Sequence, residues 1–154
     1  MLDETDRRIL AALQQDGRAS VRDVAAQAHV SRANAYARLA RLEQTGVLRG
    51  YTVDIDADAL GARLPAYVHV RIKQHTWKSF QDRVWALPET IHLALVSGEY
   101  DCVLLVRTTD AGHLRELVLE RIQSFPEVLK TETVLVFEER GRSLAAWPQA
   151  PSDT

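Results

Sequence analysis

The segment 31–41 carries the side chains whose chemistry is easiest to interpret. Arginine can grip guanine or a phosphate through two hydrogen bonds, and asparagine can do the same for adenine. Four arginines and one glutamate lie between His29 and Gly50, which gives a local charge of +3. This composition predicts a DNA-binding surface. The candidate contact residues carry polar or cationic groups on or beside two short helices: Ser20, Arg22, Ser31, Arg32, Asn34, Tyr36, Arg38 and Arg41.

Two capped helices joined by a short turn are expected to position these residues. Ser20 suits the N-cap of the first helix, where its hydroxyl accepts a backbone N–H, and Asp23 completes a pair that resembles a capping box. The chain turns over residues 27–30, and Ser31 suits a second N-cap. Gly46 can adopt the left-handed conformation that ends the second helix. Apolar residues at helical spacing form the inward stripes: Val21, Val24, Ala25, Ala35, Leu39 and Leu42.

The outward face of the second helix follows from the same spacing. Asn34, Ala37 and Arg41 should point away from the stripe, with Arg32, Tyr36 and Arg38 beside it. An ordinary solvated helix is the alternative. The capped preceding helix and the short turn with Val30 favour DNA binding over it.

A further helix is expected over residues 2–16. Asp3 suits its N-cap, and Asp6 lies where an acid interacts favourably with the helix dipole. Ile9, Leu10 and Leu13 form its apolar stripe, which should pack across the other two helices as a three-helix unit. Arg18 and Arg22 are candidates for phosphate contacts, although a solvated role fits each equally well.

The second half of the chain has a different periodicity. Alternation from Ala66 to Lys73 predicts a strand, and further strands are expected over residues 91–95, 102–107 and 129–138. Helices are expected after Thr76 and after Asp110, with Pro88 and Pro126 closing them. The order is βαββαβ, which is ferredoxin-like. The expected fold class is therefore α+β, with an N-terminal helix-turn-helix (winged-helix-like) domain and a C-terminal ferredoxin-like domain.

This order leaves one face of the sheet without helices. The segment 102–106, CVLLV, is apolar on both sides, and so is much of the last strand. An apolar sheet face needs cover, so we predict a homodimer through the C-terminal domain. A dimer also supplies two recognition helices for two half-sites.

Length and composition set the domain plan. The 154 residues are 46% apolar and 26% charged, with a net charge of −2. We expect a DNA-binding domain at 1–53, an acidic linker at 54–64, a ligand-binding and dimerisation domain at 65–142 and a tail at 143–154. Cys102 is the single cysteine, which agrees with a reducing compartment. The N-terminus is unlike a signal peptide and no apolar run approaches a membrane span, so we expect a cytoplasmic protein with no membrane partner.

Two separate segments resemble one known family. The run VRDVAAQAHVSRANAYARLARLEQTGVLRGYTVDID resembles the helix-turn-helix segment of the leucine-responsive regulatory protein/AsnC (Lrp/AsnC) family of prokaryotic transcription regulators. The matching residues are Ser31, Arg38, Arg41-Leu42-Glu43, Gly46-Val47-Leu48 and Gly50-Tyr51. A second match, Val96 to Asp101, resembles the family's Gly-x-Tyr/Phe-Asp turn in the effector domain. The resemblance implies a DNA-binding regulator controlled by a small effector, with an amino acid as the expected one, and dimers that often form tetramers or octamers.

The turn at Gly98 to Asp101 is the candidate effector site. Glycine lets a ligand approach the backbone, and the Asp101 carboxylate could pair with an α-ammonium group. On the residues alone, a plain hairpin turn in which Asp101 caps its own backbone is the stronger interpretation. The resemblance favours a ligand, because family members bind amino acids near this turn, between subunits. Ser97 departs from the threonine of many members. The candidate effector residues are Gly98, Glu99, Tyr100, Asp101, Thr131 and Thr133.

Catalytic and cofactor functions have little support. The five histidines show no metal-ligand pairing, and Asp54, Asp56 and Asp58 lack the glycine and glutamate of a calcium loop. We therefore expect that the protein is not an enzyme and that it binds neither a metal ion nor a cofactor. The alternative function is a ligand-binding oligomerisation module that does not bind DNA directly.

Overall fold

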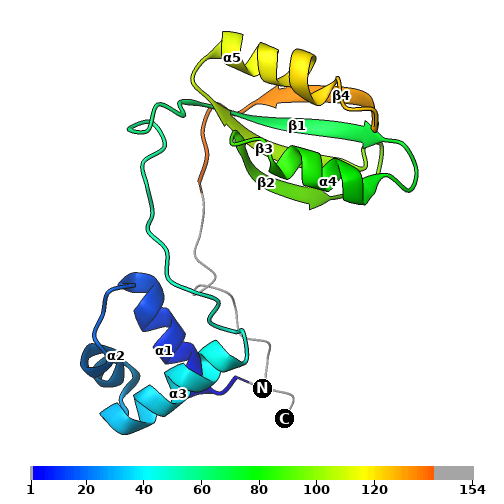
Figure 1. Ribbon diagram of the computed structural model, residues 1–154. Helices are drawn as coiled ribbons and strands as arrows, with labels where there is room; N and C mark the ends of the chain where they lie inside the picture. Colours follow the sequence, from blue (N-terminus) through cyan, green and yellow to red (C-terminus); the bar gives the residue numbers. More distant parts are fainter. Residues whose placement is uncertain (1, 141–154) are drawn as a thin grey trace. The chain divides into compact units, whose positions relative to one another are not determined.

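A computed structural model describes residues 2–140 of the chain (Figure 1). The described residues form two compact units, one extending to Asp54 and the other spanning Ile55–Glu139. The tail expected at 143–154 lies outside the described residues.

The first unit contains the expected three helices. They are α1 (Glu4–Gln15), α2 (Val21–Ala28) and α3 (Arg32–Gln44). Their apolar stripes meet in one core that includes Ile9, Leu13, Val24, Leu39 and Leu42. Burial of these stripes holds together helices that would be marginal in isolation.

Side chains cap all three helices of this unit. Asp3 and Asp6 form a reciprocal capping box at α1. Ser20 accepts from the backbone N–H of Asp23, and Ser31 accepts from that of Asn34. Ser20 also donates to the Asp23 carboxylate at 2.7 Å, so Asp23 does not complete the box as expected.

The connection between α2 and α3 is tight. His29 has a φ of 57°, a left-handed conformation that reverses the chain within three residues. Gly46, at a φ of 69°, follows α3 as expected. The described residues form no strand over 45–63, so the wing of a winged helix is absent from this part of the chain.

The second unit has the expected βαββαβ order. Its strands are β1 (Leu64–Ile72), β2 (Thr90–Leu95), β3 (Cys102–Thr108) and β4 (Val128–Leu135). Its helices are α4 (Trp77–Trp85), α5 (Ala111–Glu116) and a π-helical continuation, η1 (Leu117–Ile122). The antiparallel sheet has the strand order β2-β3-β1-β4.

One face of the sheet packs against the helices. Val68 and Val70 of β1 and Leu104 of β3 are fully buried with Phe80 of α4 and Leu117 of η1. Cys102 is buried in the same core, and burial raises the pKa of its thiol to about 12, as expected for an inert packing cysteine.

Two local features differ from the sequence prediction. The expected continuous helix after Asp110 becomes a π-helix over Leu117–Ile122, which period-3.6 reasoning does not anticipate. Thr76 precedes α4, but its hydroxyl donates to the Lys73 carbonyl at 2.7 Å and does not cap the helix.

The other face of the sheet carries a different set of side chains. Alternation along β1 puts Tyr67, His69 and Arg71 on this face, opposite the helices. The register places Leu105 of β3 and Val134 of β4 on either side of Tyr67. Tyr67 is 38% exposed and Val134 is 44% exposed. We call this surface, defined by Tyr67, Leu105 and Val134 with their neighbours, the open face.

Candidate nucleic-acid interface and effector turn

The start of α3 presents several polar side chains to solvent. Arg32 and Asn34 are exposed, and Tyr36 is 68% exposed. On α2, Arg22 is exposed and Ser20 is committed to the cap. A helix that offers donors at its opening turns, with its other side in a core, can enter a major groove.

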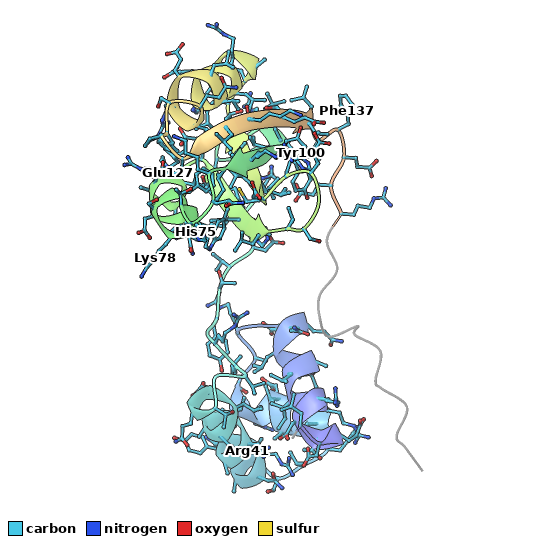
Figure 2. The ribbon with its side chains drawn as sticks, turned by 90° about the vertical axis from the view of Figure 1, so that its right-hand side faces the viewer. Arg41, His75, Lys78, Tyr100, Glu127 and Phe137 are labelled. Carbon is cyan, nitrogen blue, oxygen red and sulfur yellow. The ribbon has the colours of Figure 1, made fainter. Side chains whose placement is uncertain are left out.

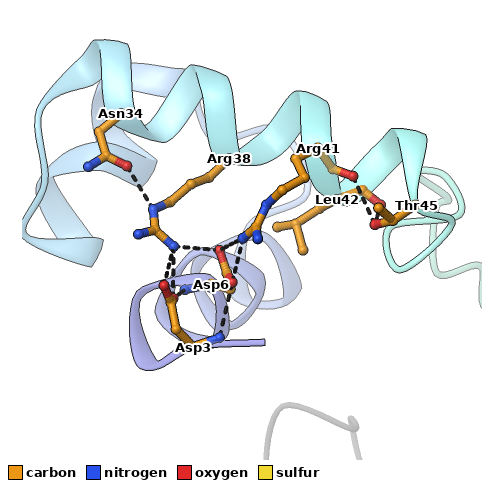
Figure 3. Close-up of polar contacts among 7 residues, drawn as sticks. All are labelled: Asp3, Asp6, Asn34, Arg38, Arg41, Leu42 and Thr45. Carbon is orange, nitrogen blue, oxygen red and sulfur yellow. Dashed lines mark hydrogen bonds and ion pairs between the residues drawn. The ribbon is translucent and has the colours of Figure 1, made fainter. Parts of the chain in front are cut away.

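Arg38 and Arg41 belong to an ion-pair network around the buried side chain of Asp6 (Figure 3). Nη2 of Arg41 lies 2.6 Å from both carboxylate oxygens of Asp6. Nη1 of Arg38 lies 2.8 Å from Oδ1 of Asp6, and 2.8 and 2.6 Å from the two oxygens of Asp3. The network ties the first turn of α1 to the middle of α3.

This network corrects one expectation and adds to another. Arg41 was expected to point away from the apolar stripe of α3, but its guanidinium lies back against α1, because a buried acid attracts it. Asp6 lies in the first turn of α1 as expected, and its fully buried side chain also binds both arginines. The roles of Arg38 and Arg41 in DNA binding stay predictions.

The network also sets the protonation of the two acids. Burial raises the pKa of the Asp6 carboxyl, but hydrogen bonds from Arg41 and Arg38 outweigh it and lower that pKa from 3.8 to about 2. The hydrogen bond from Arg38 lowers the pKa of Asp3 as well. Both acids are therefore ionised at neutral pH.

A pH-dependent stability follows from Asp6. Because its folded-state pKa lies below the unfolded value of about 3.9, the ion pairs stabilise the first unit above about pH 4 and lose effect as the pH falls toward 2. When the pH is lowered from 5 to 3, we expect protonation of this carboxyl to reduce the free energy of unfolding of the first unit by about 1 kcal/mol. Hydrogen exchange of α1 and α3 amides at the two pH values measures it. If the Asp6→Asn protein lost as much stability between pH 5 and pH 3 as the wild type, the pH dependence could not be assigned to Asp6.

The turn from Gly98 to Asp101 joins β2 to β3. Figure 2 labels Tyr100, whose ring makes an edge contact with His69 at a centroid distance of 5.5 Å. The Tyr100 hydroxyl donates to Glu132, and this hydrogen bond raises the pKa of Tyr100. Nζ of Lys130 lies 2.9 Å from Glu99 and 5.1 Å from the Tyr100 ring centroid. The turn is therefore tied to β1 and β4 by polar contacts.

Asp101 has a structural contact of its own. Its Oδ2 accepts from the backbone N–H of Ile72 at 2.8 Å, and its backbone N–H donates to Val70 at 3.0 Å. Asp101 therefore holds the turn against β1, and does not cap its own turn. Within the described chain Oδ1 has no hydrogen-bond partner, which leaves one oxygen for a ligand.

Thr131 and Thr133 do not face Tyr100. The register pairs them with Val70 and Val68, so they lie on the helix side of the sheet, whereas Tyr100 contacts His69 and Glu132 on the open face. Thr131 accepts from Gln123 at 2.7 Å. Within one chain these threonines therefore do not line a site together with Tyr100, and their role in effector binding stays a prediction.

The partnership of Asp6 with the two arginines was missed by sequence reasoning. Asp6 precedes Ile9 and Leu10 by three and four residues, the spacing of the buried stripe. An acid inside that stripe signals a buried charge that requires a partner. The sequence holds no comparable signal for which arginines of α3 become the partners of Asp6.

Both units match known protein families. The AsnC-type helix-turn-helix domain matches residues 2–43, and the Lrp/AsnC ligand binding domain matches residues 65–144. The chain belongs to the Lrp/AsnC family. It is 33% identical to the leucine-responsive regulatory protein of Escherichia coli K12 over 141 residues, covering 90% of this chain and 86% of that protein. It is also 33% identical to the regulator AldR of Mycolicibacterium smegmatis, over 92% of this chain and 85% of that one.

Solved Lrp/AsnC structures have the same fold. A transcriptional regulator of Neisseria meningitidis, crystallised with L-methionine, matches with a TM-score of 0.88 and 26% identity, over 94% of this chain and 96% of that one. The protein is thus a helix-turn-helix transcriptional regulator of the Lrp/AsnC type, with a ligand-binding domain, and the relatives named here are regulators rather than enzymes.

Two further features of the described residues bear on other functions. Over residues 2–140 no group of three or more His, Cys, Asp or Glu side chains is arranged to hold a metal ion. The carboxylate of Asp56 instead accepts from the backbone N–H of Asp58 at 2.9 Å. In the same range, every helix is too short or too polar to span a bilayer.

Proposed function

We propose that this Lrp/AsnC regulator binds operator DNA as a homodimer, with one α3 in each of two major-groove half-sites, and that an amino acid modulates the binding. The observation that carries the DNA part is the capped α2–turn–α3 unit with Arg32, Asn34 and Tyr36 exposed at the start of α3. Arg22 on α2 is a candidate for phosphate contact.

The open face supports the dimer. Tyr67, Leu105 and Val134 form an apolar centre on a sheet that has helices on its other face only. A layer of this kind is stable when a second layer covers it, and a second copy supplies an equivalent face. Assembly of such dimers into a tetramer or octamer belongs to the same proposal.

An amino-acid effector is supported by two observations. The family's ligand-binding domain covers residues 65–144, and the regulator of Neisseria meningitidis was crystallised with L-methionine. In this chain the free oxygen of Asp101 suits an α-ammonium group, and Gly98 permits close approach of a ligand to the backbone.

DNA binding is tested by its salt dependence. Phosphate contacts release counterions, so the logarithm of affinity should fall linearly with the logarithm of salt concentration, by about 0.9 per contacted phosphate. If Arg32 contacts a phosphate, Arg32→Ala should reduce this slope by about 2 per dimer, because each subunit loses one contact. Fluorescence anisotropy with the protein's own upstream DNA gives both slopes.

A control variant tests whether the change in salt dependence comes from the lost Arg32 contact or only from the lower net charge. Lys78→Ala removes an exposed cation from α4, in the other unit, and should leave the slope unchanged. Salt-independent binding, or no binding at low salt, would contradict direct DNA recognition and favour the oligomerisation module.

The effector is tested by thermal shifts with each of the twenty amino acids. A ligand at a hundredfold excess over its Kd should raise the melting temperature by about 10 °C. Asp101→Asn keeps an acceptor for the Ile72 N–H but removes the charge that would pair with an ammonium group, so the shift should vanish while the fold persists. Asp82→Asn, the same substitution at an exposed position of α4, is the control and should leave the shift intact. Undiminished amino-acid binding by Asp101→Asn in calorimetry would place the pocket elsewhere.

A further inference from the structure

We propose that Asp3 restrains DNA binding, because its carboxylate occupies the position on Arg38 that a DNA phosphate would otherwise take. The phosphate has to displace Asp3 before it can bind the guanidinium. This inference rests on the proposed DNA binding and specifies what limits the attraction of the same site for the DNA backbone.

The two acids that bind Arg38 differ in their exposure. Asp6 is fully buried, and it pairs with Arg41 at 2.6 Å as well as with Arg38. The side chain of Asp3 is 54% exposed, and its two carboxylate oxygens lie 2.8 and 2.6 Å from Nη1 of Arg38. The Arg38 side chain is itself 24% exposed. Asp3 is therefore the partner of Arg38 that a ligand from solvent can replace.

The guanidinium of Arg38 stays oriented when Asp3 is displaced. Its Nε donates to Oδ1 of Asn34 at 2.7 Å, and its Nη1 donates to Oδ1 of Asp6 at 2.8 Å (Figure 3). Among the described residues, its Nη2 has no hydrogen-bond partner. A cation that is already held in position loses little conformational freedom when it binds a second group.

The charges of the network show why Asp3 opposes DNA. The two acids carry −2 and the two arginines carry +2, so the four side chains together are neutral. Without the charge of Asp3 the sum would be +1. A phosphate and a carboxylate are both anions that accept hydrogen bonds from arginine, so they compete for the same donors. DNA therefore gains a phosphate contact at Arg38 but breaks the ion pair between Arg38 and Asp3.

The test is the Asp3→Asn variant of the full-length protein. Asparagine caps helices as well as aspartate does, so it retains an acceptor for the Asp6 backbone N–H while it removes the charge. Fluorescence anisotropy with the protein's own upstream DNA should show an affinity about tenfold higher at low salt, because neither subunit of the dimer has to break an ion pair. The slope of log affinity against log salt should steepen by up to about 2.

Two comparisons assign this gain to a phosphate bound by Arg38. A duplex of unrelated sequence and the same length should show a similar gain, because phosphate contacts carry no sequence information. In an Arg38→Gln background, Asp3→Asn should give no gain beyond that of a matched change in net charge. Asp16→Asn supplies the matched change, since it removes the same charge from an exposed position after α1. If Arg38→Gln does not fold, the comparison of Asp3→Asn with Asp16→Asn decides alone.

The outcomes separate this inference from the proposed function. If Asp3→Asn bound DNA no more tightly than Asp16→Asn, the restraint by Asp3 would be refuted while DNA binding stood. A gain confined to the upstream sequence would refute the assignment to a phosphate. If neither the wild type nor Asp3→Asn bound DNA at low salt, the proposed function would fall, and this inference with it.

Discussion

Asp6→Asn is expected to lower the free energy of unfolding of the first unit by about 2–3 kcal/mol. The carboxylate is fully buried and accepts hydrogen bonds from Arg38 and Arg41, which together hold its pKa near 2. Asparagine keeps the size but loses the charge and one acceptor, so two guanidinium groups lose their shared partner. Native-state hydrogen exchange of α1 and α3 amides measures the change within this unit.

A matched change on the same helix supplies the control. Arg8 and Glu4 form an exposed ion pair on α1 at 3.2 Å, and exposed pairs of this kind contribute about 0.5 kcal/mol or less. Arg8→Gln should therefore have a small effect. If Asp6→Asn and Arg8→Gln lowered the free energy of unfolding equally little, the ion pairs of the buried Asp6 would not be a main source of stability in this unit.

Val134→Arg is expected to weaken the proposed dimer by about a hundredfold or more. Val134 lies beside Tyr67 on the open face, and at 44% exposed it can accommodate a longer side chain in a single subunit. In a dimer formed through this face the guanidinium would be buried without a partner, which costs several kcal/mol. Sedimentation equilibrium over a range of protein concentrations measures the dissociation constant.

Leu119→Arg is the corresponding control. Leu119 is 49% exposed on η1, in the layer on the other side of the sheet, so the same substitution there should leave the dimer intact. A Val134→Arg protein that dimerises as tightly as the wild type would move the interface to another surface. A monomeric wild type would rule out the proposed assembly.

Local patterns in the sequence were enough to predict the elements and their order. Ser20 and Ser31 precede apolar residues at helical spacing, and both cap their helices in the structure. Alternation from Ala66 to Ile72 separates a buried from an exposed side of β1. Caps and periodicity act over a few residues, so they can be interpreted from the chain alone.

The partners of individual polar side chains depended on the tertiary structure. Asp6 and Arg41 are 35 residues apart, and nothing local indicates that folding places them 2.6 Å apart. Likewise, only the sheet register shows that Thr131 and Tyr100 lie on opposite faces.

The sequence by itself therefore determined the two-part architecture, the capped recognition helix and the family of this regulator. The tertiary structure decided which cations face the acids of α1 and which donors stay available for DNA. The physical reason is that a buried charge is neutralised by whichever side chain the packing of distant segments brings near.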